Sequence, residues 1–261
     1  MKLVRYSVAD DPEPRVGELL DDRIFDRLAS TSVSLSDARL LPPVEPTYLR
    51  DFMLFEDHAR GGAARRGEDL NPAWFEIPIS YKGNHREILG PDEDLAYPSW
   101  TEWLDFELEI ACVVGRTVRD VAQEEAADAI AGYTIMNDWS ARDVQRAEMA
   151  MRLGPARSKD FATSLGPALV TPDAFDPREP HRTEARVDGE TWFVGSTDQI
   201  SRPFAEVISW VSRTETVHAG DVYGSGTQFG GCGLDLDRKL PRRCVVELEV
   251  EGIGVLRTRI V

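Results

Sequence analysis

Leu104-Asp105-Phe106-Glu107-Leu108-Glu109 restricts the possible fold classes more than any other stretch, because apolar and acidic residues alternate along it. A repeat of two predicts a strand with one buried face, and we expect this strand to cover 104–114. Glu107 and Glu109 then lie on the same face, with Cα atoms about 6.5–7 Å apart. Carboxylates this close repel each other unless they point into water or share a cation.

The alternation by itself leaves two interpretations open. Glu247-Leu248-Glu249-Val250-Glu251 has the same pattern near the C-terminal end, where a solvated strand face explains it. A third acid, Asp138, lies in a Trp-containing segment that is unusual for plain surface. With Glu107 and Glu109 it offers three hard oxygen ligands, which suit Mg²⁺, Ca²⁺ or Mn²⁺ better than zinc.

A histidine follows an aspartate at a spacing that suggests a shared cavity. The pattern over 48–66 predicts a helix, and Asp51 and His58 would then lie two turns apart on one face. His58 suits general base chemistry near neutral pH, although a surface helix with an incidental histidine fits equally well. His85 is the only rival base. The small and basic run 61–67 predicts a mobile loop.

Arg142 and Gln145 are three residues apart in a segment that predicts a helix through Met151, opened by a capping box at Ser140. Both side chains can therefore face one pocket. Together with Lys159 they suit a polarised or carboxylated substrate. The alternative is structural ion pairing of Arg142 and of Lys159 with nearby acids.

Composition excludes several classes of protein. The chain has 261 residues, of which 42% are hydrophobic and 29% charged, as in ordinary globular proteins. A net charge of −16 argues against nucleic acid and anionic membranes as partners. We find no signal peptide and no spanning segment, and the three widely spaced cysteines form neither a disulfide framework nor a zinc motif. A cytoplasmic protein is expected.

Short runs of strand character predominate, and helices do not alternate with them regularly. The fold class is therefore predicted as mixed and mainly β rather than doubly wound. A Pro-rich linker at 41–46 predicts a small N-terminal domain over 1–45 and a catalytic domain over 46–261. In the second part we expect a helix over 203–213 and a hairpin around Gly252-Ile253-Gly254.

From Tyr48 to the C-terminus the chain resembles the fumarylacetoacetate hydrolase family. Five elements in the right order carry the resemblance, where each alone would be weak. They are Asp51 with His58 seven residues later, L-D-F-E-L-E at 104–109, M-N-D-W-S-A-R-D-V-Q at 136–145, K-D-F-A-T-S-L-G-P at 159–167 and G-D-V-Y-G-S-G-T at 220–227.

The resemblance implies a β-roll catalytic domain, assembled as a homodimer, with a divalent cation, Mg²⁺ before Ca²⁺ or Mn²⁺. The implied catalytic residues are His58, Asp235 and Lys159. The implied substrate-binding residues are Tyr81, Arg142, Gln145 and Thr227. The implied metal ligands are Asp51, Glu107, Glu109 and Asp138.

The implied activity is hydrolysis of a C–C bond in a β-diketone or acylpyruvate through a metal-stabilised enolate, with a place in aromatic catabolism. The same chemistry serves a 2-oxo acid decarboxylase, a 2-keto-4-pentenoate-type hydratase or a 2-oxohept-3-ene-1,7-dioate isomerase. Two departures from the family pattern weaken a claim to fumarylacetoacetate itself. Asp235 stands where the hydrolase branch has a glutamate, and Met53 replaces a pocket tyrosine.

Overall fold

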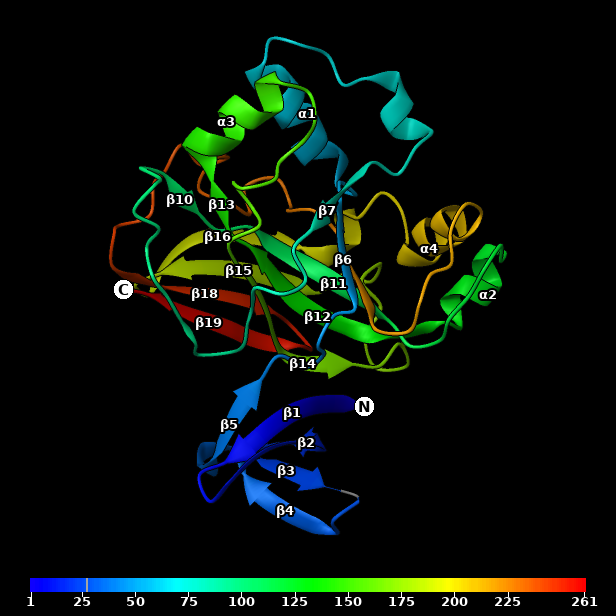
Figure 1. Ribbon diagram of the computed structural model, residues 1–261, viewed down its shortest axis with the longest axis vertical. Coiled ribbons are helices and arrows are strands. Elements are labelled where there is room, and N and C mark those ends of the chain that lie inside the picture. Colours follow the sequence, from blue (N-terminus) through cyan, green and yellow to red (C-terminus); the bar gives the residue numbers. More distant parts are fainter. Residues whose placement is uncertain (27) are drawn as a thin grey trace.

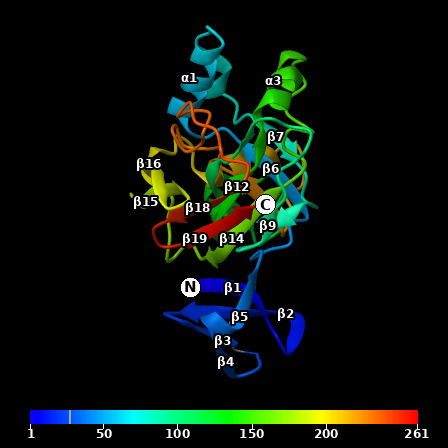
Figure 2. The same ribbon diagram turned by 90° about the vertical axis from the view of Figure 1, so that its left-hand side faces the viewer.

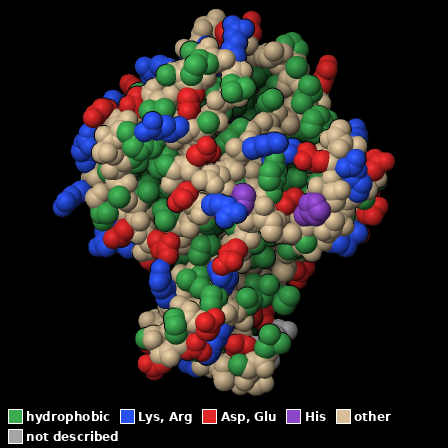
Figure 3. Space-filling view, in the orientation of Figure 1, with side chains coloured by type: hydrophobic (Ala, Val, Ile, Leu, Met, Phe, Trp, Pro, Cys, Tyr) green, Lys and Arg blue, Asp and Glu red, His purple; other side chains and the backbone are tan. Residues whose placement is uncertain are grey.

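The computed structural model describes residues 1–26 and 28–261, and strands make up most of its regular structure (Figure 1). The fold is mixed and mainly β, as predicted. Within the described residues, no helix is long and apolar enough to cross a membrane. Acidic and basic side chains are interspersed over the face drawn in Figure 3.

The first strands form a lobe that lies at the end of the molecule opposite α1 and α3 (Figures 1 and 2). They are β1 (Lys2–Val8), β2 (Asp11–Leu20), β3 (Arg23–Asp26), β4 (Thr31–Ser34) and β5 (Ala38–Leu41). Val4, Tyr6 and Ile24 pack there with Ala168. The expected boundary near residue 45 falls between β5 and β6, and the division into two domains stays a prediction.

The lobe continues into a large sheet, because β1 pairs antiparallel with β14. The described strands follow the order β4-β3-β2-β1-β14-β12-β11-β17-β6-β7, with β5 beside β1 and β8 beside β14. The further members are β6 (Tyr48–Phe52), β7 (Ser80–Gly83), β8 (Ile88–Leu89), β11 (Leu108–Val114), β12 (Ile130–Asp138), β14 (Thr163–Val170) and β17 (Asp221–Gly224).

A second sheet packs against the first through a common core. It has the order β16-β15-β18-β19-β9, and a separate two-stranded pair joins β10 (Leu104–Asp105) to β13 (Ser140–Ala141). The core contains Ile110 and Ile135 of the first sheet with Val246 and Leu248 of the second. The strands are β9 (Asp94–Leu95), β15 (Arg182–Val187), β16 (Glu190–Ser196), β18 (Cys244–Val250) and β19 (Gly254–Ile260).

Helices lie outside the sheets. Of these, α2 lies beside α4 on one flank, while α1 and α3 occupy the end away from the N-terminal lobe (Figure 1). The α-helices are α1 (Glu56–Arg65), α2 (Gln123–Ala127), α3 (Arg142–Ala150) and α4 (Phe204–Ser212). Short 3₁₀ turns are η1 (Leu35–Asp37), η2 (Pro72–Phe75) and η3 (Thr197–Gln199). The helix expected over 203–213 and the hairpin at 252–254 are confirmed.

The helix predicted over 48–66 is wrong in its first part. Tyr48–Phe52 is strand β6, because it pairs in parallel with β17 and antiparallel with β7. Partners distant in sequence thus override the local pattern. The loop predicted at 61–67 is also wrong, since α1 continues to Arg65 and buries Ala59 and Ala63.

Two further expectations need correction. The strand predicted over 104–114 is two strands, because at Glu107 the backbone N–H donates to the Asn137 side chain instead of a ladder partner. Ser140 does not cap α3, whose N-cap is Ala141. The Ser140 hydroxyl donates to the carbonyl of Asp138 instead.

Candidate active site

Three carboxylates from neighbouring strands meet in the large sheet. Asp51 comes from β6, Glu109 from β11 and Asp138 from the end of β12, and one oxygen of each lies within 4.8 Å of the others. All three side chains are buried. Asp51 and Glu109 therefore approach across β17, which lies between their strands.

Glycine at position 224 makes this approach possible. Gly224 pairs with Asp51 on one side and Ala111 on the other. A Cβ there would lie 2.2 Å from Met136 Cε, 2.6 Å from Asp51 Oδ1 and 2.8 Å from Glu109 Oε2. Any side chain at 224 would thus enter the space between the carboxylates.

Burial and mutual repulsion strongly disfavour the charged forms of this carboxylate group. Desolvation and the nearby Asp138 charge raise the pKa of Asp51 to about 8. Burial raises the pKa of Asp138 to about 6, although Lys159 opposes this, and the pKa of Glu109 lies well above its usual range. Such a cluster gains most when a cation neutralises it.

The carboxylate group fits the expected divalent cation. Its donors are hard oxygens, the type that Mg²⁺ and Ca²⁺ prefer. Oε1 of Glu109 is buried and has no hydrogen-bond partner within the described residues. Because a buried polar atom without a partner is costly, this oxygen is a natural ligand.

Glu107 occupies a different position from the other three predicted ligands. Its Oε1 lies 2.8 Å from Arg142 Nη2, and Lys159 Nζ donates to its Oε2. Burial alone would raise its pKa, but Lys159 and Arg142 lower that pKa to about 2. Lys159 also donates to Asp138, so one ammonium group links Glu107 to the carboxylate group.

Arg142 is enclosed by partners from its own chain. Its Nε lies 2.8 Å from Asp105 Oδ2, and its Nη1 lies 3.0 Å from Gln145 Oε1. The third nitrogen, Nη2, lies 2.8 Å from Glu107 Oε1 in an ion pair that lacks hydrogen-bond geometry. The expected proximity of Arg142 and Gln145 is therefore present, and the guanidinium fixes the position of Glu107.

The other two predicted substrate residues lie beside the same strands. The hydroxyl of Tyr81, on β7, donates to Asp138 Oδ2. Thr227 is buried, and its hydroxyl donates to the carbonyl of Leu108 at 3.1 Å. Tyr81 thus adjoins the carboxylate group directly, whereas Thr227 contacts the strand that carries Glu109.

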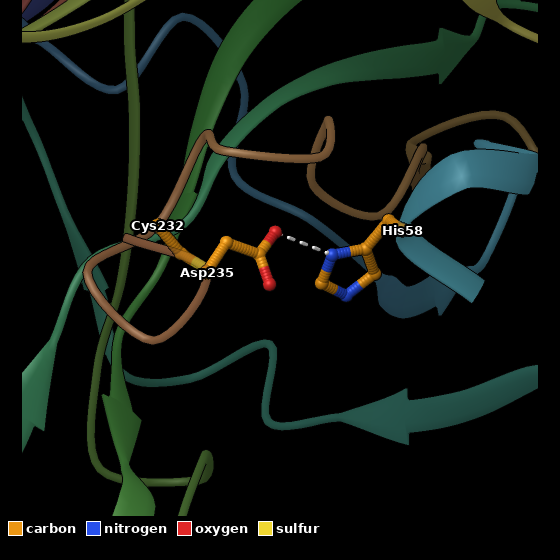
Figure 4. A group of neighbouring side chains, drawn as sticks. All are labelled: His58, Cys232 and Asp235. Atoms are coloured by element: carbon orange, nitrogen blue, oxygen red, sulfur yellow. Dashed lines mark hydrogen bonds and ion pairs between the residues drawn. The ribbon is translucent and has the colours of Figure 1, made fainter. Parts of the chain in front are cut away.

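A histidine–aspartate pair forms a second cluster (Figure 4). His58, on α1, lies with Nδ1 3.0 Å from Asp235 Oδ2. The same oxygen accepts the Gly230 N–H at 2.9 Å, and Oδ1 accepts from Arg65 Nη2 at 2.6 Å. Burial would raise the pKa of Asp235, but His58, Gly230 and Arg65 together lower it. The rival His85 lies in a turn after β7.

Asp105 fixes the loop that carries Asp235. Its carboxylate is fully buried and accepts the backbone N–H groups of Gly233 and Leu234 at 2.8 and 2.9 Å. A Cβ at Gly233 would lie 2.5 Å from Asp105 Oδ1, so only glycine permits this approach. An isolated bridge joins Glu107 to Cys232 and brings the two clusters together.

The sequence predictions did not include three residues of this site. Arg65 follows His58 by seven residues, a spacing that would place both on one helix face. Because the sequence pattern predicts a loop at 61–67, it gives no reason to interpret this spacing as helical. Asp105 belongs to the quoted acidic stretch, although its role as a backbone acceptor has no sequence signature. Gly226 donates to Asp51 and Glu109, and only the folded chain brings them together.

Comparison with family models gives one match over most of the chain. Residues 49–261 match the model described as fumarylacetoacetate (FAA) hydrolase C-terminal. Oxaloacetate tautomerase YisK of Bacillus subtilis is 30% identical over 241 residues, which is 90% of this chain and 77% of that protein.

Solved structures resemble the whole chain. The fumarylacetoacetate hydrolase of Exiguobacterium antarcticum has a TM-score of 0.83 at 28% identity, covering 100% of this chain and 99% of that one. The 5-carboxymethyl-2-hydroxymuconate delta-isomerase of Mycobacterium smegmatis has a TM-score of 0.82 at 27% identity, with the same coverage. Relatives of this fold thus carry the names of a hydrolase, an isomerase and a tautomerase.

Proposed function

The chain belongs to the fumarylacetoacetate hydrolase family, and on this premise we propose that it is an acid–base enzyme for a small 2-oxo acid. In this proposal His58 moves a proton at the carbon next to the carbonyl group. The pair His58–Asp235, beside a buried group of carboxylates, is the observation that carries the proposal.

The two members of the pair have distinct tasks. Asp235 stays ionised, so its oxygen accepts the proton on His58 Nδ1. Nε2 of the same ring is then unprotonated and free to take a proton from the substrate. Arg65 and the Gly230 N–H keep Asp235 in position while this happens.

The carboxylate group provides the second part of the proposed site. Asp51, Glu109 and Asp138 would hold a divalent cation, which when bound supplies positive charge next to a carbonyl oxygen. Lys159, between Glu107 and Asp138, balances the negative charge that surrounds it. Arg142 holds Glu107 in place, and Tyr81 orients Asp138.

Keto–enol tautomerisation of a 2-oxo dicarboxylate is the first candidate reaction. It requires only that a base removes a proton from carbon and that a proton returns elsewhere, which His58 can do. The similarity to the tautomerase of B. subtilis extends over more than three quarters of each protein. That similarity favours tautomerisation over the hydrolysis expected from sequence.

Hydrolysis of an acylpyruvate or β-diketone is the second candidate. Here His58 would take a proton from one water, whose oxygen attacks the carbonyl; the C–C bond then breaks, the acyl fragment leaves as a carboxylic acid, and the enolate fragment takes up a proton. The structural likeness to a fumarylacetoacetate hydrolase supports this alternative. The decarboxylase and hydratase reactions pass through a related enolate and stay as alternatives within the family.

One experiment in D₂O separates the candidates. The Mg²⁺-loaded protein is incubated with oxaloacetate and with an acylpyruvate, and NMR follows deuterium uptake next to the carbonyl and the appearance of products. Faster exchange than in the buffer control, without fragments, supports tautomerisation. Two carboxylic or ketonic fragments support hydrolysis. Neither exchange nor cleavage above the His58→Ala background would reject the proposal.

The remaining expectations concern the substrate class, the oligomeric state and the cellular location. A small-molecule substrate follows from membership of this enzyme family. A homodimer and a cytoplasmic location stay predictions. The three described cysteines are free and buried, which is compatible with a reducing compartment.

A further inference from the structure

Cys232 lies beside the proposed base, and the reaction above does not use it. One ring nitrogen of His58, Sγ of Cys232 and one carboxylate oxygen of Asp235 all lie within 4.8 Å of one another. Figure 4 shows the Asp235 carboxylate directed toward His58, with Cys232 on the same loop and on the side of Asp235 away from His58. The thiol is free of any disulfide and fully buried.

The donor chemistry of this trio differs from that of the carboxylate group. An imidazole nitrogen, a sulfur and a carboxylate oxygen form a set that zinc prefers, whereas three carboxylates suit Mg²⁺ or Ca²⁺. The protein thus places a softer donor set next to a harder one. A zinc-type ion and a magnesium-type ion would therefore select different positions.

The distances are close to what a tetrahedral ion requires. Ligand bonds of about 2.0–2.1 Å place a nitrogen and an oxygen about 3.3 Å apart. His58 Nδ1 and Asp235 Oδ2 are 3.0 Å apart. A sulfur ligand belongs about 3.6 Å from the nitrogen, and Sγ of Cys232 lies within 4.8 Å of one ring nitrogen of His58, so it would have to move by about 1.2 Å at most.

We propose that His58, Cys232 and Asp235 form a second metal site, specific for a zinc-type ion, whose occupation inhibits the enzyme. Three protein ligands leave a fourth position for water. Arg65 and the Gly230 N–H already orient Asp235, as partners of a metal ligand commonly do.

Zinc binding requires two of the ligands to lose a proton, so the affinity depends on pH. Burial raises the pKa of the Cys232 thiol well above its usual value, and Arg142 opposes this only in part. A metal must displace the thiol proton and the proton on His58 Nδ1. Affinity for zinc should therefore rise with pH.

Inhibition rests on the proposed role of His58, whereas binding does not. An ion on Nδ1 withdraws electron density from the ring and breaks the contact with Asp235, so Nε2 loses its function as a base. The spectroscopic part of the test below reports binding even if the protein has no activity on any 2-oxo acid.

The test uses the full-length protein with Mg²⁺ in excess. Co²⁺ is titrated as a coloured substitute for zinc, and thiolate-to-cobalt charge-transfer absorption in the near ultraviolet is recorded. We expect this band in the wild type and in Cys244→Ser, a matched control at another buried cysteine, and its loss in Cys232→Ser. Cys232→Ala repeats the measurement if the serine variant does not fold.

The activity part follows Zn²⁺ inhibition in the same proteins. Cys232→Ser and Cys232→Ala should keep their basal rate but need more than about tenfold higher Zn²⁺ for half inhibition. Cobalt binding without the thiolate band would overturn the proposal. Equal zinc sensitivity in wild type and both variants would do the same, especially if Mg²⁺ relieves it, because zinc would then be acting at the carboxylate group.

Discussion

Asp51 and Glu109 accept a hydrogen bond from the same backbone N–H, that of Gly226, at 3.0 and 3.2 Å. One donor therefore serves two buried carboxylates from different strands. Burial and the charges of the neighbouring carboxylates nevertheless raise the pKa values of both groups. The consequence is a protein whose stability depends on pH and on a bound cation.

Stability of the metal-free protein should fall as pH rises from about 4 to about 8. In this window Asp51 has lost its proton in the unfolded chain, where its pKa is about 3.9, but keeps it in the fold, where the pKa is about 8. The unfolded state therefore binds fewer protons, and increasing pH favours it. Thermal unfolding in EDTA measures the effect.

Mg²⁺ should reverse this trend. A cation favours the ionised carboxylates, so the increase in Tm on adding Mg²⁺ should be larger at pH 8 than at pH 5.5. Glu109→Gln removes one of the repelling charges and serves as the control for the pH dependence of Tm. A Tm in EDTA that stays level between pH 5 and pH 8 would contradict the buried, repelling arrangement.

Gly224→Ala should weaken cation binding. The new methyl group would lie within 2.8 Å of oxygens of both Asp51 and Glu109 and would push them apart. We expect affinity for Mg²⁺ to fall by about tenfold or more, measured by calorimetric titration. Gly62→Ala is the matched control, because only the end of Arg66 lies near its Cβ position, and it should bind Mg²⁺ normally.

His58→Ala should lower kcat by about 10²–10⁴-fold, because it removes the proposed base. Mg²⁺ affinity should stay unchanged, since His58 is not part of the carboxylate group. His85→Ala, in a turn after β7, should keep the wild-type rate. If His58→Ala remains active, the base has been assigned to the wrong residue.

Arg65→Gln should reduce kcat by about tenfold with little change in KM. Without the guanidinium, Asp235 loses the partner of its second oxygen and holds the imidazole less firmly. Arg65→Lys, which keeps the charge, should recover part of the rate. Arg66→Gln removes an exposed arginine that pairs with Glu68 and should have no effect. Equal kinetics of Arg65→Gln and Arg66→Gln would exclude this positioning role.

Lys159→Met should destabilise the metal-free protein by about 3–5 kcal/mol. The substitution leaves Glu107 and Asp138 buried without the cation that both contact. Urea unfolding in EDTA provides the measurement. Lys82→Met, at an exposed position of β7, should change the free energy of unfolding little. A small effect at Lys159 would mean that Arg142 alone balances the acids.

Sequence periodicity alone is enough to predict the mainly β class, the C-terminal hairpin and helix α4. These elements depend on contacts between near neighbours, so their patterns are visible locally. The pairing of residues 48–52 with β17 has no such local sign, and the helix expected there is a strand.

The candidate site likewise has some features that the sequence predicts and others that only the folded structure shows. Five motifs in the right order, through their resemblance to the family, are enough to select Asp51, His58, Glu109 and Asp138 as candidates, whereas each motif alone leaves a structural interpretation open. Only the tertiary structure shows that Arg142 and Lys159 hold Glu107, and that Lys159 links it to Asp138 of the carboxylate group. It also places Asp105 and Arg65 around Asp235. These relationships join residues far apart in the chain, and their energies come from burial and charge that exist only after folding.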